Sequence, residues 1–136
     1  MTTPKTILAR ILFVLYLCAI AFLCFMHIDK LPDVQKFIFG IPTDKLAHFL
    51  MFLPFPILAY LAYDHLTNKV WNAVLFAVVT MLVGGLIAYG TEYVQGRLPY
   101  RSMDIRDFKA DALALVISSV AVFIVDVTHI KVRKKN

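Results

Sequence analysis

The stretch from Val70 to Thr91 contains no charged residue. As a helix rising about 1.5 Å per residue, a run of this length crosses the ~30 Å hydrocarbon core of a bilayer. Three further apolar runs accompany it, and 60% of the 136 residues are hydrophobic while 17% are charged. Soluble domains average about 45–50% apolar and about 25% charged residues. A chain this short cannot bury so much apolar surface inside itself, so we expect an all-α membrane protein.

The four apolar runs predict a single domain over residues 1–136 with four transmembrane helices. A secretory signal peptide is the competing interpretation of the first run, because Ala19-Ile20-Ala21 resembles a cleavage site. The apolar run continues past that point, which favours a retained helix. The approximate bounds that we predict for the helices are 7–28, 45–63, 70–93 and 107–129.

Two local features refine these helices. Pro54 and Pro56 lie in the middle of the second run and should bend it. Gly84, Gly85 and Ala88 form a strip of small residues in the third run, where another helix can approach closely. Both features are typical of helices that pack against one another in a membrane.

The fourth run is short of charge-free residues. Only Ala112 to Val125 lacks charge, whereas a span needs about 20 residues. The helix must therefore include Asp111 and Asp126, which we expect close to an interface or in a wet cavity lined by protein. The connector 29–44 is mixed in polarity, and we expect it to lie in the interface with a short helix after Pro32.

Four crossings place both termini on one side of the membrane. The two sides tie at seven Lys and Arg residues each, so the charge rule alone does not fix the orientation. The basic tail at residues 131–135 favours cytoplasmic termini in a bacterial inner membrane, with the 29–44 and 96–107 loops facing outward. The same tail suits anionic lipid headgroups better than nucleic acid.

Ionisable and amide side chains recur where three of the runs meet the outward side. In this topology they reach the same depth although they are distant in sequence, and polar residues at membrane depth are typically functional. Taken singly, each has a structural interpretation, for example Asp44 as a helix cap. Together they predict a polar pocket lined by Asp44, Lys45, His48, Glu92, Gln95, Arg101, Asp104, Asp107 and Asp111.

The acidic residues of this set must be neutralised. Asp104, Asp107 and Asp111 follow an i, i+3, i+7 spacing, so they share one face if the helix is continuous. Arg101, one turn earlier, is a local candidate to neutralise them, and a divalent ion or a shared proton is another. A Mg²⁺ or Ca²⁺ ion held by Glu92, Asp104 and Asp107 would use the oxygen ligands that these ions prefer.

Two blocks of the sequence resemble the VanZ-like family of small bacterial membrane proteins. The first is Asp44-Lys45-x-x-His48-Phe49, and the second runs from Glu92-x-x-Gln95 through Arg101-x-x-Asp104-x-x-Asp107 to Asp111. The family usually has Asn at the last of these positions. With the four-helix layout, the resemblance covers the chain from Asp44 to about Val120. It implies a cell-envelope protein related to one associated with low-level teicoplanin resistance.

Three functions remain open at this stage. The first is non-enzymatic binding of a lipid-linked cell-wall intermediate or an amphiphilic antibiotic such as a glycopeptide. The second is a metal-dependent membrane enzyme that acts on a phospho- or acyl-lipid, with His48 as general acid or base. The third is a small lipid transporter. The sequence lacks a phosphate-binding Gly-rich loop, zinc-type ligand spacing and a Ser-His-Asp arrangement.

Overall fold

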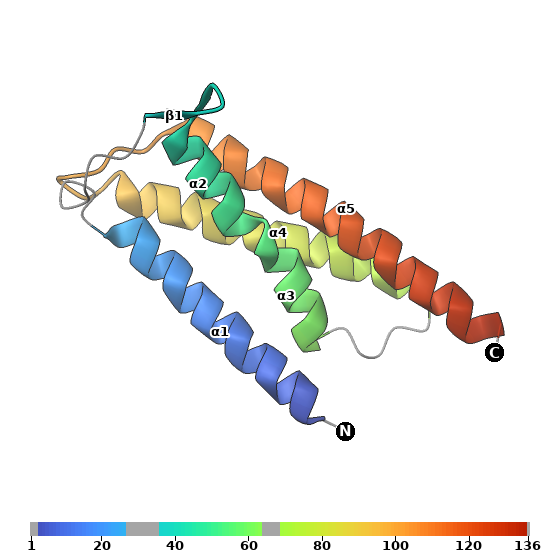
Figure 1. Ribbon diagram of the computed structural model, residues 1–136. Coiled ribbons are helices and arrows are strands. Elements are labelled where there is room, and N and C mark those ends of the chain that lie inside the picture. Colours follow the sequence, from blue (N-terminus) through green and yellow to red (C-terminus); the bar gives the residue numbers. More distant parts are fainter. Residues whose placement is uncertain (1–2, 27–35, 64–68, 136) are drawn as a thin grey trace.

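The computed structural model describes residues 3–26, 36–63 and 69–135 (Figure 1). Within them, four helical segments are long and apolar enough to cross a membrane. They comprise α1 (Pro4–Phe25), α2 (Thr43–Phe52) continued by α3 (Pro54–Tyr63), α4 (Val70–Gln95) and α5 (Ile105–Lys135). The prediction of an all-α protein with four helices of spanning length is confirmed.

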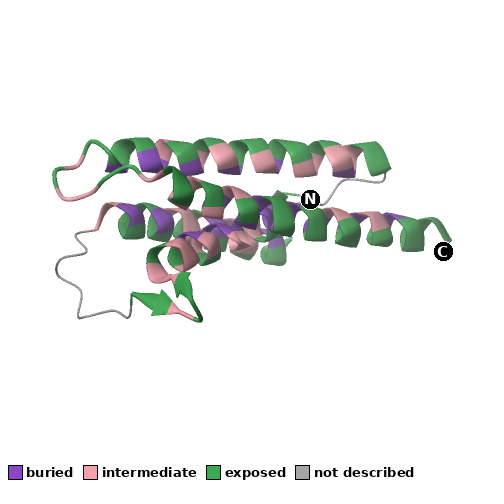
Figure 2. Cartoon of the chain, turned by 90° about the horizontal axis from the view of Figure 1, so that it is seen from above, coloured by how far each residue is buried: buried purple, intermediate pink, exposed green. Residues whose placement is uncertain are grey.

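Helix α5 is central to the bundle. Helices α2, α3 and α4 all pack against it, and α1 packs mainly on α3 (Figure 1). The start of α1, the end of α3 and the end of α5 lie toward the same end of the bundle (Figure 1), and we call this the terminal end. The opposite end, where the hairpin of residues 36–42 and the loop of residues 96–104 lie, we call the loop end. Buried residues follow the inner faces of the helices (Figure 2).

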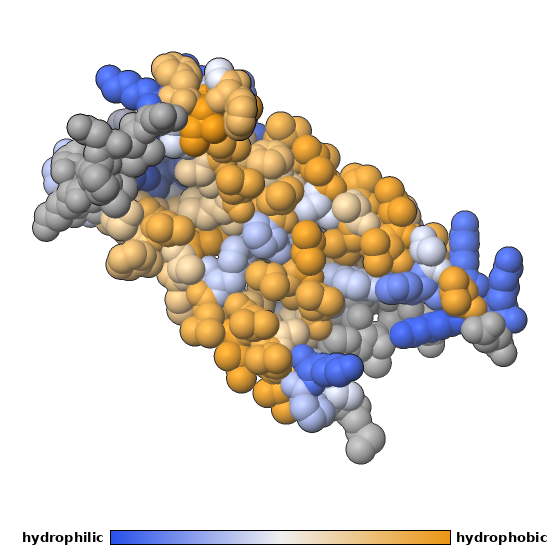
Figure 3. Space-filling view, viewed as in Figure 1, coloured by the Kyte–Doolittle hydropathy of each residue, from blue (hydrophilic) through white to orange (hydrophobic). Residues whose placement is uncertain are grey.

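The outer surface matches a lipid environment. Figure 3 shows apolar residues covering most of the length of the helices, with hydrophilic residues gathered at the two ends. Large apolar side chains such as Leu86 and Phe22 are about 70% exposed, at 72% and 68% respectively. In water such a surface would be unfavourable, whereas in a bilayer it contacts lipid chains.

Six of the eight predicted helix bounds differ from the structure, by two to six residues. Helix α1 ends at Phe25 and not at Ile28, because Met26 has an extended backbone with φ −69° and ψ 145°; residues 27 and 28 lie outside the described ranges. Helix α5 runs over 31 residues, about 46 Å long. It exceeds the predicted 107–129 because a helix can continue into the polar phase, where Lys and Arg are good helix formers.

The described part of the connector is a β-hairpin. Strand β1 (Phe37–Ile38) pairs antiparallel with β2 (Ile41–Pro42). Phe39 and Gly40 join them with φ angles of 52° and 78°, as a tight two-residue hairpin turn requires. The predicted interfacial helix is therefore wrong for residues 37–42, and its beginning after Pro32 lies outside the described residues.

The second span is interrupted where the sequence predicted a bend. Leu53 separates α2 from α3, directly before Pro54, because a proline within a helix lacks an N–H donor and clashes with the preceding turn. Tyr16 of α1 donates a 2.5 Å hydrogen bond to the carbonyl of Met51 beside this break. The break is thus supported from the neighbouring helix.

Only part of the small-residue strip in α4 faces another helix. A Cβ atom at Gly84 would lie 2.6 Å from a methyl group of Leu115 on α5, whereas one at Gly85 would meet nothing within 4 Å. Ala88 is fully buried. Close packing of α4 on α5 is therefore confirmed at Gly84, Ala88 lies in the core, and Gly85 faces outward.

Helix α5 carries both predicted carboxylates within its length. Asp111 is 0% exposed and Asp126 is 4% exposed. Near the terminal end, the hydroxyl of Tyr60 donates a 3.5 Å hydrogen bond to Asp126. The prediction that the fourth helix includes both residues is confirmed, and each faces protein.

Candidate functional site

The nine residues predicted to form a pocket lie at the loop end. Asp44, Lys45 and His48 occupy the first turns of α2, and Glu92 and Gln95 occupy the last turn of α4. The others lie in the 96–104 loop and the first turns of α5. Packing of α2 and α4 against α5 brings the three groups together.

Lys45 is the cation at the centre of the acidic residues. Its Nζ atom lies 2.8 Å from Asp107 Oδ1, 2.9 Å from Asp44 Oδ2 and 3.2 Å from Asp104 Oδ2. The Lys45 side chain is 18% exposed. These contacts tie the beginning of α2 to the beginning of α5, and a largely buried ammonium group needs such partners.

Arg101 does not take the role that the sequence suggested for it. It makes no ion pair within 4.0 Å to a carboxylate among the residues that the structure describes; Lys45 does so instead. The physical reason is position. Arg101 lies in the loop before α5 and lines a cavity, whereas the α2 turn that carries Lys45 packs directly on α5.

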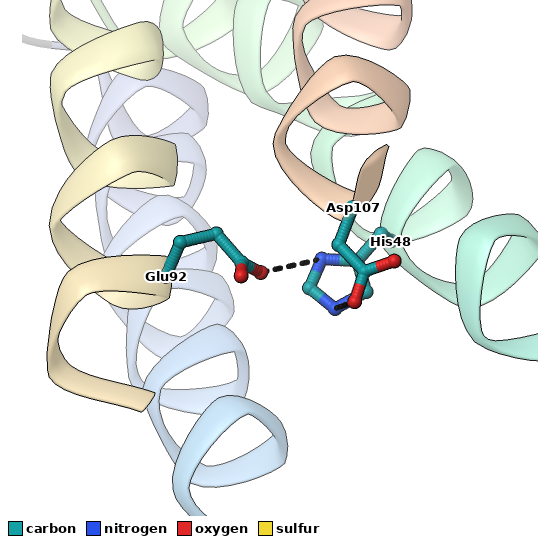
Figure 4. A group of neighbouring side chains, drawn as sticks. All are labelled: His48, Glu92 and Asp107. Atoms are coloured by element: carbon teal, nitrogen blue, oxygen red, sulfur yellow. Dashed lines mark ion pairs between the residues drawn. The ribbon is translucent and has the colours of Figure 1, made fainter. Parts of the chain in front are cut away.

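His48 lies among three carboxylates from two other helices. Its Nδ1 atom is 3.1 Å from Asp111 Oδ1 and 3.7 Å from Glu92 Oε1, and its Nε2 atom is 3.7 Å from Asp107 Oδ2. Figure 4 shows the imidazole ring between Glu92 of α4 and Asp107 of α5. Within a bundle of apolar helices, this concentration of charge is expensive unless it is compensated.

Glu92 is the most enclosed member of this group. Its side chain is 0% exposed. Oε2 accepts a 3.2 Å hydrogen bond from the backbone N–H of Asp104, which fastens the 96–104 loop to α4. Oε1 has no hydrogen-bond partner among the described residues, although buried polar atoms are normally paired.

Asp104 caps α5 and is not on its helical face. The helix begins at Ile105, and the Asp104 carboxylate accepts a 2.8 Å hydrogen bond from the backbone N–H of Arg106, two positions inside the helix. This bond, with the Arg106 and Lys45 side chains, lowers the pKa of Asp104 to about 2. The expected cap at Asp44 is wrong: α2 begins at Thr43 without a side-chain cap.

Gln95 and Tyr100 connect this site to the end of α1. Gln95 Nε2 donates a 2.7 Å hydrogen bond to the carbonyl of Cys24, and the Tyr100 hydroxyl donates a 3.1 Å hydrogen bond to the carbonyl of Phe25. These carbonyls belong to the last turn of α1, where the intrahelical partners run out. Gln95 therefore holds α1 against the site.

A cavity of about 740 Å³ opens beside these residues at the loop end. One part of its wall is apolar and comes from the end of α1 and from α2. The other part is polar and carries both signs of charge. Its lining residues are Leu23, Cys24, Met26, Asp44, Ala47, His48, Leu50, Met51, Gln95, Tyr100, Arg101, Ser102, Asp104 and Asp107.

The apolar wall of this cavity was not predicted. In the sequence, Leu23 and Leu50 look like ordinary lipid-facing residues of spanning helices. The signal that could have found them is their position within about two turns of the loop end of their helices, because the polar set gathers at that end. Of the predicted nine, Lys45, Glu92 and Asp111 do not line the cavity, and Glu92 and Asp111 are fully buried.

Two groups of three described residues have ligand atoms close enough to share a metal ion. One is His48, Glu92 and Asp107, and the other is Asp44, Asp104 and Asp107. The three predicted metal ligands therefore do not form one group: Glu92 belongs to the first, Asp104 to the second and Asp107 to both. In the second group the Lys45 ammonium already provides the positive charge.

Comparison with protein-family models, with curated proteins and with solved structures finds no significant match to this chain.

Proposed function

We propose that the protein binds the polar headgroup of a membrane amphiphile in the cavity at the loop end, without chemical conversion of the ligand. The observation that carries the proposal is the composition of that cavity. Apolar side chains form one wall and charged side chains the other, in a space of about 740 Å³. Pockets of about 300–1,000 Å³ commonly hold a small ligand.

The position of the cavity fits such a ligand. It lies where α1, α4 and the α2–α3 span reach one end of the bundle, which is headgroup depth if these helices cross a bilayer. An acyl or polyprenyl chain could leave the cavity along Leu23 and Leu50, which are 47% and 54% exposed. The headgroup would remain among the polar residues.

The charges of the cavity specify the kind of headgroup. Lys45 is surrounded by three carboxylates, so it offers little attraction to an anion. Arg101 has no carboxylate partner among the described residues and can bind a phosphate or carboxylate of the ligand. Asp44, Asp104 and Asp107 can accept hydrogen bonds from amines or sugar hydroxyls. The favoured ligand therefore carries both an anionic group and several donors.

Two ligand classes meet this description: a lipid-linked cell-wall intermediate and a glycopeptide antibiotic with a lipid tail. The resemblance of Asp44-Lys45-x-x-His48 and the Glu92-to-Asp111 block to the VanZ-like family supports both. We propose accordingly that the protein lies in a bacterial cytoplasmic membrane with its loop end outward. A fluorescent protein that folds only in the cytoplasm should then be bright when fused to the C-terminus.

Native mass spectrometry of the protein in phosphatidylcholine nanodiscs tests the proposal. One arm adds a polyprenyl-linked cell-wall precursor to the nanodiscs, and the other adds teicoplanin. We expect one ligand per chain in one of the two arms. Arg101→Ala should weaken binding by roughly 10- to 100-fold, because a charge-assisted hydrogen bond contributes about 1.5–3 kcal/mol.

Arg97→Ala is the matched control. Arg97 lies in the same loop, but it donates to the Tyr93 hydroxyl and its guanidinium lies 4.8 Å from the centre of that ring, away from the cavity. Both variants remove one positive charge, and only the Arg101 variant should lose the ligand. Equal binding by the two variants, or no binding of either ligand by the wild type, would refute the proposal.

A further inference from the structure

The Oε1 atom of Glu92 is a buried acceptor without a donor. The side chain is 0% exposed, and this oxygen has no hydrogen-bond partner among the described residues. It points at the His48 ring, with 3.7 Å between Oε1 and Nδ1 (Figure 4). A buried charged acceptor that is left unsatisfied is strongly unfavourable, so we expect a ligand at this atom.

The charge balance around this atom points to a cation. Among the described residues, ion pairs and close contacts join five carboxylates into one group, and Lys45 and Arg106 are its two permanent cations. If all five carboxylates are ionised, even a protonated His48 leaves two negative charges uncompensated. Coulomb repulsion is strong at the buried part of the group, where His48, Glu92 and Asp111 are at most 5% exposed. The five carboxylates are those of Asp44, Glu92, Asp104, Asp107 and Asp111.

We propose that His48, Glu92 and Asp107 bind one divalent transition-metal ion. Each of the three offers one ligand atom, and these atoms all lie within 4.8 Å of one another. His48 is held from α2, Glu92 from α4 and Asp107 from α5, so the ligands converge from three helices. Asp111, 3.1 Å from His48 Nδ1, fixes the imidazole ring as outer-shell carboxylates do in metal sites.

The donor set selects the type of ion. One imidazole nitrogen with two carboxylates suits Mn²⁺, Fe²⁺ or Zn²⁺, whereas Mg²⁺ and Ca²⁺ prefer oxygen ligands alone. The neighbouring group of Asp44, Asp104 and Asp107 is a poorer site, because the Lys45 ammonium lies within 3.2 Å of each of these residues. An ion there would have to displace it.

Such an ion would lie beside the cavity, since His48 and Asp107 contribute to the cavity wall. It would join α2, α4 and α5 at the loop end and add positive charge next to Arg101. The metal site is inferred from the unpaired Glu92 oxygen, from the charge balance and from the positions of the three ligand atoms. It does not require that the cavity bind an amphiphile, and its failure leaves that proposal intact.

Metal analysis of the purified protein in detergent tests the inference directly. The protein is stripped with EDTA, dialysed against Mn²⁺ or Zn²⁺, and its metal content measured by plasma mass spectrometry. We expect one ion per wild-type chain, retained against excess Mg²⁺. In the Mn²⁺ sample, electron spin-echo spectroscopy should detect the imidazole nitrogen of His48. The absence of stoichiometric metal, or of nitrogen coupling, overturns the inference.

Variants locate the ion. Glu92→Gln preserves the shape of the side chain and an acceptor for the Asp104 N–H, and it should weaken binding by about tenfold or more. Asp44→Asn is the control, because it removes the same charge from the other acidic group. Metal retained equally by both variants rules out this site. The spin-echo result on the wild type stands even if Glu92→Gln does not fold.

Discussion

Replacing Lys45 by methionine should destabilise the bundle through the carboxylates that it leaves behind. Methionine keeps most of the apolar stem and removes the ammonium. Asp107, 2.8 Å from Nζ, and Asp104, 3.2 Å from it, would then lose their cation from α2. The perturbation acts on the junction of α2 and α5 at the loop end, and the spanning surfaces are unchanged.

The burial of the partners sets the magnitude. Removing one partner from a fully buried pair costs roughly 3–5 kcal/mol, and an exposed pair contributes about 0.2–1 kcal/mol. The side chains of Lys45 and Asp107 are 18% and 14% exposed, so we expect a loss of about 2 kcal/mol. Asp44 is 56% exposed, and solvent screening should keep the cost of Asp44→Asn below about 1 kcal/mol.

Unfolding of the protein by SDS in mixed micelles, followed by circular dichroism in the presence of EDTA, measures these differences. The double variant Lys45→Met with Asp107→Asn should be more stable than the sum of the single effects predicts, by about 1 kcal/mol, since the stranded charge is gone. Strict additivity, or equal losses for Lys45→Met and Asp44→Asn, would show that the ion pairs do not stabilise the junction.

Four further variants should change stability in the same unfolding assay. Gly84→Ala should lower stability by about 1–3 kcal/mol because its Cβ overlaps α5, while Gly85→Ala should raise it by about 0.5–1 kcal/mol. Tyr16→Phe should cost about 1 kcal/mol, the value of its bond to the Met51 carbonyl. Asp104→Ala should destabilise α5 at neutral pH. The pKa of Asp104 is about 2 in the folded protein. The loss of unfolding free energy in the variant should therefore be complete above about pH 4, the ordinary pKa of Asp, and should vanish as the pH falls through about 2.

The gathering of the polar residues at one end could be predicted from the sequence. Long uncharged runs determine where helices cross, and alternating crossings bring the end of one run beside the start of another. Residues as distant as His48 and Asp111, 63 positions apart, therefore meet within 3.1 Å. The depth of a residue in the membrane follows from counting along the chain.

The lateral arrangement could not be predicted in the same way. Helices α4 and α5 are apolar around much of their circumference, so periodicity does not identify the face that each turns inward. The choice between Lys45 and Arg101 as the partner of Asp107 depends on helix rotation. It also depends on α5 starting at Ile105, after the cap. The 39–40 turn was missed because a positive φ at Phe39 is unusual for a residue with a large side chain.

The two cations at the loop end differ in what holds them there. Lys45 stands in the first turn of α2, where the helix dipole disfavours a positive charge by about 0.3–1 kcal/mol. Its position is therefore stable only with the carboxylates around it, and those contacts leave it little capacity to attract an anion. Arg101 precedes α5 in a loop and bears no such restriction. If a ligand with a phosphate or carboxylate binds here, its affinity should depend on Arg101, while the stability of the empty protein should depend on Lys45.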